Sequence, residues 1–136
     1  MFGKKTLKKR VLLIDDEPDF TYMMKLNLEK TGRYEVCEEN KAIEAFETAK
    51  RFKPDLILLD IIMPRMSGLE VLDVIRKNEK ERGVDPKNGV KIIMVSGMKE
   101  SWMNDAFRDG CNDYIVKPYD LDFLLAKVSS MTGAEE

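Results

Sequence analysis

The sequence predicts one α/β domain in which a doubly wound sheet of five parallel strands, (βα)5, is covered by helices on both faces. Short apolar runs alternate along the 136 residues with segments whose apolar residues repeat at helical spacing. The central runs are apolar throughout, as expected of parallel strands that are buried on both faces. The links are short, and successive βαβ units of this kind make right-handed crossovers that place helices on both sides of the sheet.

Five runs are the expected strands. Three of them, 11–14, 56–59 and 92–95, are continuous apolar stretches typical of central strands. The segment 34–38 alternates between apolar and polar residues, which indicates an edge strand. The last run, 114–116, is short and ends just before a lysine and a proline.

Two amphipathic helices are expected between the first three strands. Apolar residues three and four positions apart mark them over 20–28 and 42–49. A weaker stripe predicts a helix over 100–109, and 83–89, bounded by glycines, should be a loop. The helix over 100–109 has few apolar anchors and should therefore be easy to displace.

Capping residues predict where the other two helices begin. Ser67 and Glu70 have the Ser-x-x-Glu spacing of a capping box, so a helix should start there and run to near Arg82. Asp120 precedes a strong apolar stripe over 121–128 and is a suitable N-cap for the last helix.

Charge is distributed unevenly along the chain. The net charge is −2, but the first ten residues hold five basic side chains and no acids, which leaves 18 basic and 25 acidic residues, or −7, for the remainder. We expect a solvated basic tail over 1–9, a folded domain over 10–131 and a short tail over 132–136. The acidic body argues against direct binding of nucleic acid.

Several other classes of protein are disfavoured. No apolar stretch approaches the roughly 20 residues needed to span a bilayer, and the basic start is followed by too few apolar residues for a signal peptide. A cytoplasmic protein without membrane insertion is expected. Cys37 and Cys111 have no metal-binding spacing and are interpreted as small, reduced hydrophobes. Glycine motifs for nucleotides are absent.

Charged residues end three of the expected strands. Asp15 and Asp16 follow the first strand, Asp60 follows the third, and Lys117 follows the fifth. The carboxyl ends of parallel strands share one edge of the sheet, so three carboxylates and one ammonium should meet in one crevice. Like charges repel unless a cation joins them, which favours a divalent-metal site for phosphoryl transfer with an aspartate nucleophile.

Each of these residues also has an ordinary structural explanation. Asp16 or Glu17, ahead of Pro18, could serve only to start the first helix. A lysine at a strand end usually extends to solvent. Asp60 is harder to explain in this way, because a carboxylate flanked by apolar residues on both sides needs a partner or a function.

Taken together, five motifs resemble the receiver domain of two-component response regulators over residues 10–131. They are Leu13-Ile14-Asp15-Asp16-Glu17-Pro18, Leu58-Leu59-Asp60-Ile61-Ile62-Met63-Pro64, Ser67-Gly68, Val95-Ser96-Gly97 and Asp113-Tyr114-Ile115-Val116-Lys117-Pro118. The resemblance implies a flavodoxin-like sheet with strand order 2-1-3-4-5, which periodicity alone does not give. Within this family, the chain resembles stand-alone receivers of the chemotaxis-regulator type.

The resemblance also implies a role for each acidic residue. Asp60 would be the phosphoacceptor, and Mg²⁺ would be held by Asp16, Asp60 and the backbone carbonyl of Ile62. Asp15 would hold the metal through water. Oxygen ligands and retained waters are what Mg²⁺ prefers.

Three further residues take roles by the same resemblance. Lys117 would contact the phosphoryl oxygens, and Ser96 would donate a hydroxyl hydrogen bond to them. Ser96 and Tyr114 would together form the switch that remodels the face made by the fourth helix, the fifth strand and the fifth helix. Trp102 would be either a contact residue on that face or a partly buried packing residue. The Lys117–Pro118 peptide bond is expected to be cis.

Two other functions compete with a receiver. A haloacid-dehalogenase-like Mg²⁺-dependent phosphohydrolase also uses a strand-end aspartate, but that family has a second aspartate at the position of Ile62, and the chain has no room for a cap domain. A pseudo-receiver that binds proteins without being phosphorylated is the other alternative. All the active-site positions carry suitable residues, which favours a receiver.

Partners follow from what the sequence lacks. There is no histidine, so a separate histidine kinase or phosphotransfer protein must be the phosphodonor of the phosphorelay. Only eight residues follow Val128, so we expect no DNA-binding or enzymatic output domain; the output should pass to a downstream protein target.

The only expected catalysis is Mg²⁺-dependent phosphorylation and dephosphorylation of Asp60 itself. Ile62 and Met98 flank the path of the hydrolytic water in the family, and because both are apolar here we expect a long-lived phosphoform.

Overall fold

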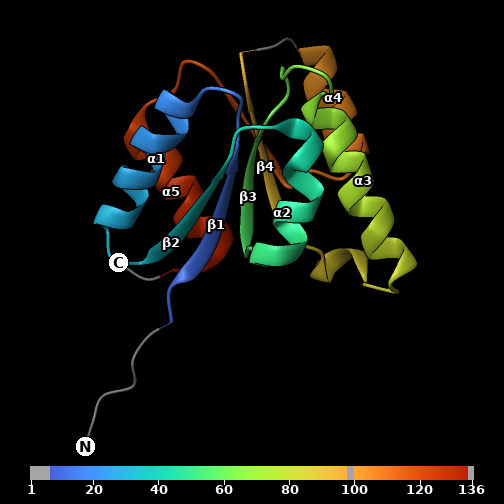
Figure 1. Cartoon of the computed structure of the whole chain (residues 1–136), viewed down its shortest axis with the longest axis horizontal. Helices are drawn as coiled ribbons and strands as arrows, with labels where there is room; N and C mark the ends of the chain where they lie inside the picture. The colour runs from blue at the N-terminus through green and yellow to red at the C-terminus, as the bar shows by residue number, and fades with distance from the viewer. Residues whose placement is uncertain (1–6, 98–99, 135–136) are drawn as a thin grey trace, which may run out of the picture.

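The computed structural model describes residues 7–97 and 100–134 and contains the expected five-stranded parallel sheet. The strand order is β2-β1-β3-β4-β5, as the resemblance implied (Figure 1). The strands are β1 (Lys9–Ile14), β2 (Tyr34–Glu39), β3 (Leu56–Asp60), β4 (Lys91–Ser96) and β5 (Asp113–Val116). Because all five strands run in the same direction, their carboxyl ends lie along one edge of the sheet.

Five helices cover the two faces of the sheet. They are α1 (Pro18–Lys30), α2 (Ala45–Phe52), α3 (Gly68–Glu81), α4 (Glu100–Arg108) and α5 (Leu121–Thr132). Helices α1 and α5 lie on one face, and α2, α3 and α4 lie on the other (Figure 1). In the part of the chain that the structure describes, no helix is long and apolar enough to cross a bilayer.

The two faces of the sheet explain why the central strands are apolar at every position. In β1, Val11 and Leu13 pack into the layer under α1 and α5, whereas Leu12 and Ile14 pack into the opposite layer. All four side chains are buried. Neighbouring residues of a strand point to opposite faces, so a sheet covered on both sides requires apolar residues in succession.

Three details differ from the sequence-based expectation. The stripe over 42–49 opens with a 3-10 turn, Ala42–Glu44, before α2 begins. The expected loop over 83–89 contains a 3-10 turn, Pro86–Asn88, whose N-cap Asp85 accepts a hydrogen bond from the Lys87 N–H. Helix α5 extends past Val128 to Thr132, where Gly133 takes a left-handed conformation (φ 69°) that ends it. Apolar periodicity did not reveal these ends because they are set by local hydrogen bonds.

Both predicted capping residues act as expected. The Ser67 hydroxyl accepts a hydrogen bond from the Glu70 N–H, and the Glu70 carboxylate accepts one from the Ser67 N–H, which completes the capping box. The Asp120 carboxylate accepts a hydrogen bond from the Asp122 N–H at the start of α5. These contacts fix where α3 and α5 begin.

The turn that follows α4 is held by α3. The Arg76 guanidinium on α3 donates to the Gly110 carbonyl (2.9 Å) and to Asn112 Oδ1 (3.0 Å), in the turn between α4 and β5. Along α4 itself, Ala106 is buried, and Trp102 packs partly buried against the core. Of the two expectations for Trp102, the packing one is therefore observed.

The start of α3 is pressed against the end of β3. The Gly68 N–H donates to the Ile61 carbonyl (2.7 Å), and a Cβ at position 68 would lie 2.0 Å from the carbonyl oxygen of Asp60. Only glycine fits at this distance, because the atom it would meet belongs to the backbone. The segment that carries Asp60 is thus fixed by close backbone packing.

Replacing Gly68 with alanine should lower the free energy of unfolding by about 2–3 kcal/mol, because the backbone near Asp60 must move to admit the methyl group. The control is Gly133→Ala, where no atom lies within 4 Å and only the left-handed backbone opposes the change. That variant should lose about 1 kcal/mol. Urea denaturation of the three proteins measures the difference, and equal losses in the two variants would contradict the close-packing argument.

Candidate functional site

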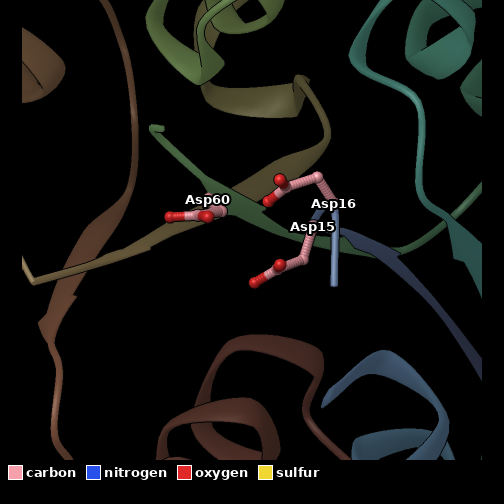
Figure 2. A group of neighbouring side chains, drawn as sticks. All are labelled: Asp15, Asp16 and Asp60. Atoms are coloured by element: carbon pink, nitrogen blue, oxygen red, sulfur yellow. The ribbon is translucent and has the colours of Figure 1, made fainter. Parts of the chain in front are cut away.

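Three aspartates gather at the carboxyl ends of β1 and β3. Asp15 and Asp16 follow β1, and Asp60 is the last residue of β3. Each supplies one carboxylate oxygen to a cluster in which these atoms all lie within 4.8 Å of one another (Figure 2). The structure therefore brings together the acidic residues that the sequence predicted would meet.

Burial makes this cluster electrostatically unfavourable. Asp15 is 4% exposed and Asp60 is 7% exposed, while Asp16 is half-buried. Burial, followed by the charge of Asp15, raises the pKa of Asp60 from its ordinary 3.8 to about 6, although Lys117 opposes the rise. A carboxylate with a raised pKa at a strand end is typical of a functional site.

Lys117 brings the only ammonium that is paired with the cluster among the described residues. Its Nζ lies 3.3 Å from Asp15 Oδ2 and 4.0 Å from Asp60 Oδ2. The peptide bond to Pro118 is cis, as expected. One ammonium against three carboxylates leaves an excess of negative charge at a point that is largely removed from water.

The donor set fits a hard divalent cation. Carboxylate oxygens are the ligands that Mg²⁺ prefers, and the cluster has more negative charge than Lys117 neutralises. The Ile62 carbonyl, the fourth expected ligand, accepts no hydrogen bond from the described residues and so has its lone pairs available.

Asp15 and Asp16 are held differently. Asp15 Oδ1 accepts a hydrogen bond from the Glu17 N–H (3.0 Å), and Oδ2 pairs with Lys117. No such bond holds the Asp16 carboxylate among the described residues, so it is the freer of the two to bind a cation directly. Glu17 is the N-cap of α1, but its side chain makes no capping hydrogen bond. Of the two residues that could start the helix, Glu17 does so through its backbone, whose carbonyl accepts hydrogen bonds from the Phe20 and Thr21 N–H groups, and Asp16 lies before the cap.

Asn40 supports the site and was not found from the sequence. Its Nδ2 donates to the Asp15 carbonyl (2.8 Å) and to the Thr21 hydroxyl (3.0 Å). Thr21 in turn donates to a carboxylate oxygen of Glu38 (2.8 Å). This chain joins the loop after β1 to β2 and α1. A single asparagine after an edge strand carries no pattern that would have marked it.

The two expected switch residues lie on neighbouring strands. Ser96 is buried at the end of β4, and its carbonyl accepts a hydrogen bond from the Lys117 N–H (3.0 Å). Tyr114 is buried on β5, and burial raises the pKa of its phenol. The neighbouring Ser96 hydroxyl partly offsets that rise in pKa, but among the described residues the phenol has no partner in hydrogen-bonding geometry.

The structure describes one of the two residues expected to flank the path of the hydrolytic water. The Ile62 side chain is 53% exposed, beside the acidic cluster. Met98 lies outside the described residues. The role of this pair stays a prediction.

A doubly wound sheet in the order 2-1-3-4-5, with an acidic crevice and a lysine at the strand ends, is characteristic of the receivers of two-component signalling. The chain belongs to this family, since the model of the response regulator receiver domain matches residues 11–129. Members of the family are signalling domains and are generally not enzymes of metabolism.

Individual relatives agree with this assignment. The chemotaxis protein CheY of Bacillus subtilis is 34% identical over 121 residues, which are 88% of this chain and 94% of that protein. CheY of Thermotoga maritima is 38% identical, over 82% of this chain and 87% of its own length. The CheY-like receiver domain protein of Methanospirillum hungatei superposes with a TM-score of 0.80 at 31% identity, covering 93% of this chain and 95% of that one.

Other relatives are about twice as long. The DNA-binding dual master transcriptional regulator RpaA of Synechocystis is 30% identical over 122 residues. Those residues are 90% of this chain but only 48% of RpaA. The receiver therefore occurs in proteins of more than one architecture.

The raised pKa of Asp60 predicts that Asp60→Asn stabilises the metal-free protein. Asp60 binds its proton more tightly when folded (pKa about 6) than at its ordinary 3.8, so its charge opposes folding above pH 6. This cost disappears as the pH falls from about 6 to below 4. At pH 7 the variant should gain roughly 1–3 kcal/mol in the free energy of unfolding, and at pH 4 almost nothing.

Chemical denaturation with a chelator present measures this difference. Asp73→Asn, which alters an exposed ion pair with Lys77 on α3, is the control and should change stability little at either pH. Adding Mg²⁺ should stabilise the native protein more than Asp60→Asn, which reduces the difference between their free energies of unfolding. A variant that is less stable than the native protein at pH 7 without metal would disprove the electrostatic account.

Proposed function

We propose that Asp60 accepts a phosphoryl group from a histidine kinase or a histidine phosphotransfer protein, and that the domain passes this signal to a downstream protein. The observation that carries the proposal is the convergence of Asp15, Asp16, Asp60 and Lys117 on one buried point. Membership of the receiver family supports it.

The chemistry requires a carboxylate that can attack phosphorus. An Asp60 oxygen would form a new P–O bond while the P–N bond of the phosphohistidine donor breaks and the imidazole leaves. Mg²⁺, held by Asp16, Asp60 and the Ile62 carbonyl, with Asp15 acting through water, would neutralise the charge of the phosphoryl group. The Lys117 ammonium would contact one phosphoryl oxygen, and the Ser96 hydroxyl would donate to another.

The proposed output surface is the face formed by α4, β5 and α5. Tyr114 lies within it, and its buried phenol has no partner in hydrogen-bonding geometry among the described residues, an arrangement that costs free energy and favours a second position. Phe107, Val116 and Phe123 are exposed apolar residues on the same three elements. A protein partner could cover them, and a shift of Ser96 and Tyr114 upon phosphorylation would change that surface.

The rival functions have less support. A phosphohydrolase of the dehalogenase type needs an acid or base two residues after the nucleophile, where Ile62 has neither function. A pseudo-receiver would have no need for two buried carboxylates, a third beside them and a paired lysine, because burying charged groups costs free energy. The bounds 10–131 for the domain, the flanking tails and a cytoplasmic location are part of the proposal.

Asp60→Asn and Asp60→Ala should each abolish covalent phosphorylation by acetyl phosphate in the presence of Mg²⁺. Among the described residues, Asp60 is the one carboxylate that is itself the last residue of a buried strand and is paired with a lysine; Asp15, which is also paired with Lys117, follows β1. Intact-protein mass spectrometry should show an 80 Da adduct in the native protein and in the control Asp73→Asn, and none in the Asp60 variants. Undiminished adduct in both Asp60 variants would refute the assignment.

Removing Asp16 should weaken Mg²⁺ binding more than removing Asp15. Asp15 is already committed to Lys117 and the Glu17 N–H, so it would act on the metal only through water. Asp15→Asn should raise the dissociation constant roughly 10- to 100-fold, and Asp16→Asn by more. Isothermal titration calorimetry gives both constants, and the reverse order would exchange the two roles.

The phosphoform should be long-lived, because Ile62 and Met98 cannot orient the attacking water. Each ~1.4 kcal/mol of lost orientation slows hydrolysis about tenfold. Ile62→Asn with Met98→Glu should therefore accelerate loss of the phosphoryl group, whereas Leu26→Asn, at another exposed apolar position, should not. Decay of the purified phosphoprotein measures this. Decay of the native form within seconds, or no acceleration in the double variant, would count against the positioning argument.

A further inference from the structure

An aromatic ring lies against the lysine of the acidic site. The Lys117 Nζ is 4.9 Å from the centroid of the Phe20 ring, within the range of a cation–π interaction. Its Nζ is also within 3.3 Å of Asp15 Oδ2 and 4.0 Å of Asp60 Oδ2. The ammonium is therefore placed between two carboxylates and an aromatic face.

Phe20 is itself held in place by its surroundings. It lies in the first turn of α1, and its ring meets the Tyr119 ring edge to face with the centroids 6.4 Å apart. Tyr119 follows Pro118 directly, so the two rings join α1 to the loop that carries Lys117. The contact thus fixes the ring relative to the lysine backbone.

The ring also borders the space into which the lysine side chain would otherwise move. An open, mainly apolar groove of about 590 Å³ runs between α1 and the loop after β5, and Phe20, Lys117 and Tyr119 line it together with Met23. Lys117 is partly exposed, at 26% of its side chain. A long, flexible ammonium side chain in this position extends to water unless something attracts it inward.

We infer that Phe20 is a positioning residue for Lys117, whose ring attracts the ammonium and keeps it directed toward Asp60. This inference rests on the proposed function, because the position matters only if Lys117 contacts the phosphoryl group. Asp15 attracts the ammonium as well, and its Oδ2 lies nearer to Nζ (3.3 Å) than Asp60 Oδ2 does (4.0 Å). The ring holds the ammonium at the border of the groove, in contact with the aromatic face while Nζ stays within 4.0 Å of Asp60 Oδ2.

The test uses beryllium fluoride with saturating Mg²⁺ as a phosphoryl analogue whose binding needs no chemical step. Phe20→Leu keeps an apolar side chain of similar size without the aromatic face, and Phe20→Tyr keeps the face. Phe20→Leu should weaken binding of the analogue roughly 3- to 10-fold, as expected for the loss of one partly exposed cation–π contact. Phe20→Tyr should bind it with the native affinity. Mg²⁺ affinity alone should change less than the affinity for the analogue.

Two controls separate positioning from packing. Tyr22→Leu removes an exposed aromatic ring from the same helix and should have no effect on the analogue. In a Lys117→Met background, Phe20→Leu should cause no further loss, because its effect passes through the ammonium. Three results would overturn the inference. They are the same loss of analogue affinity from Phe20→Leu in the Lys117→Met background, an equal loss of Mg²⁺ affinity in Phe20→Leu, and weakened analogue binding in Phe20→Tyr.

The outcome also distinguishes this inference from the proposed function. If the native protein binds the analogue and Phe20→Leu binds it equally well, the role of Phe20 is wrong and the phosphoacceptor assignment stands. If the native protein binds no analogue and takes up no phosphoryl group, both are wrong.

Discussion

Repulsion among three carboxylates at the end of the sheet is the constraint on which the rest of the site depends. Asp15 and Asp60 are buried, and Asp16 lies beside them; among the described residues, Lys117 supplies the one ammonium paired with them. Such a cluster lowers the stability of the metal-free protein, since burial disfavours charge. The same instability gives the site an affinity for cations, because a divalent ion removes the repulsion that the fold maintains.

The surrounding structure resists the relaxation that this repulsion would otherwise cause. Asn40 holds the loop after β1 through the Asp15 carbonyl, and the backbone contact at Gly68 holds the end of β3. Neither contact involves an acidic side chain, so neither occupies a carboxylate oxygen of the cluster. A rigid support of this kind is what allows a charged site to be prepared before its ligands arrive.

The fold and most of the site could be predicted because they depend on simple patterns. A charged residue at the end of a continuous apolar run is conspicuous, so Asp60 and Lys117 were identifiable from the sequence. Strand order was not, since periodicity describes each strand and not its neighbours, and it came from family resemblance. Asn40 and the Phe20–Lys117 contact were missed because they join segments that are distant in sequence through single side chains.

The Arg76 contacts at the far end of α4 have a mechanical consequence. They fasten the turn at Gly110 and Asn112 to α3, and along α4 itself Ala106 is buried while Trp102 and Met103 pack partly buried against the core. Any displacement of this turn must either carry α3 with it or break both hydrogen bonds, so the Arg76 side chain links α3 to the junction between α4 and β5.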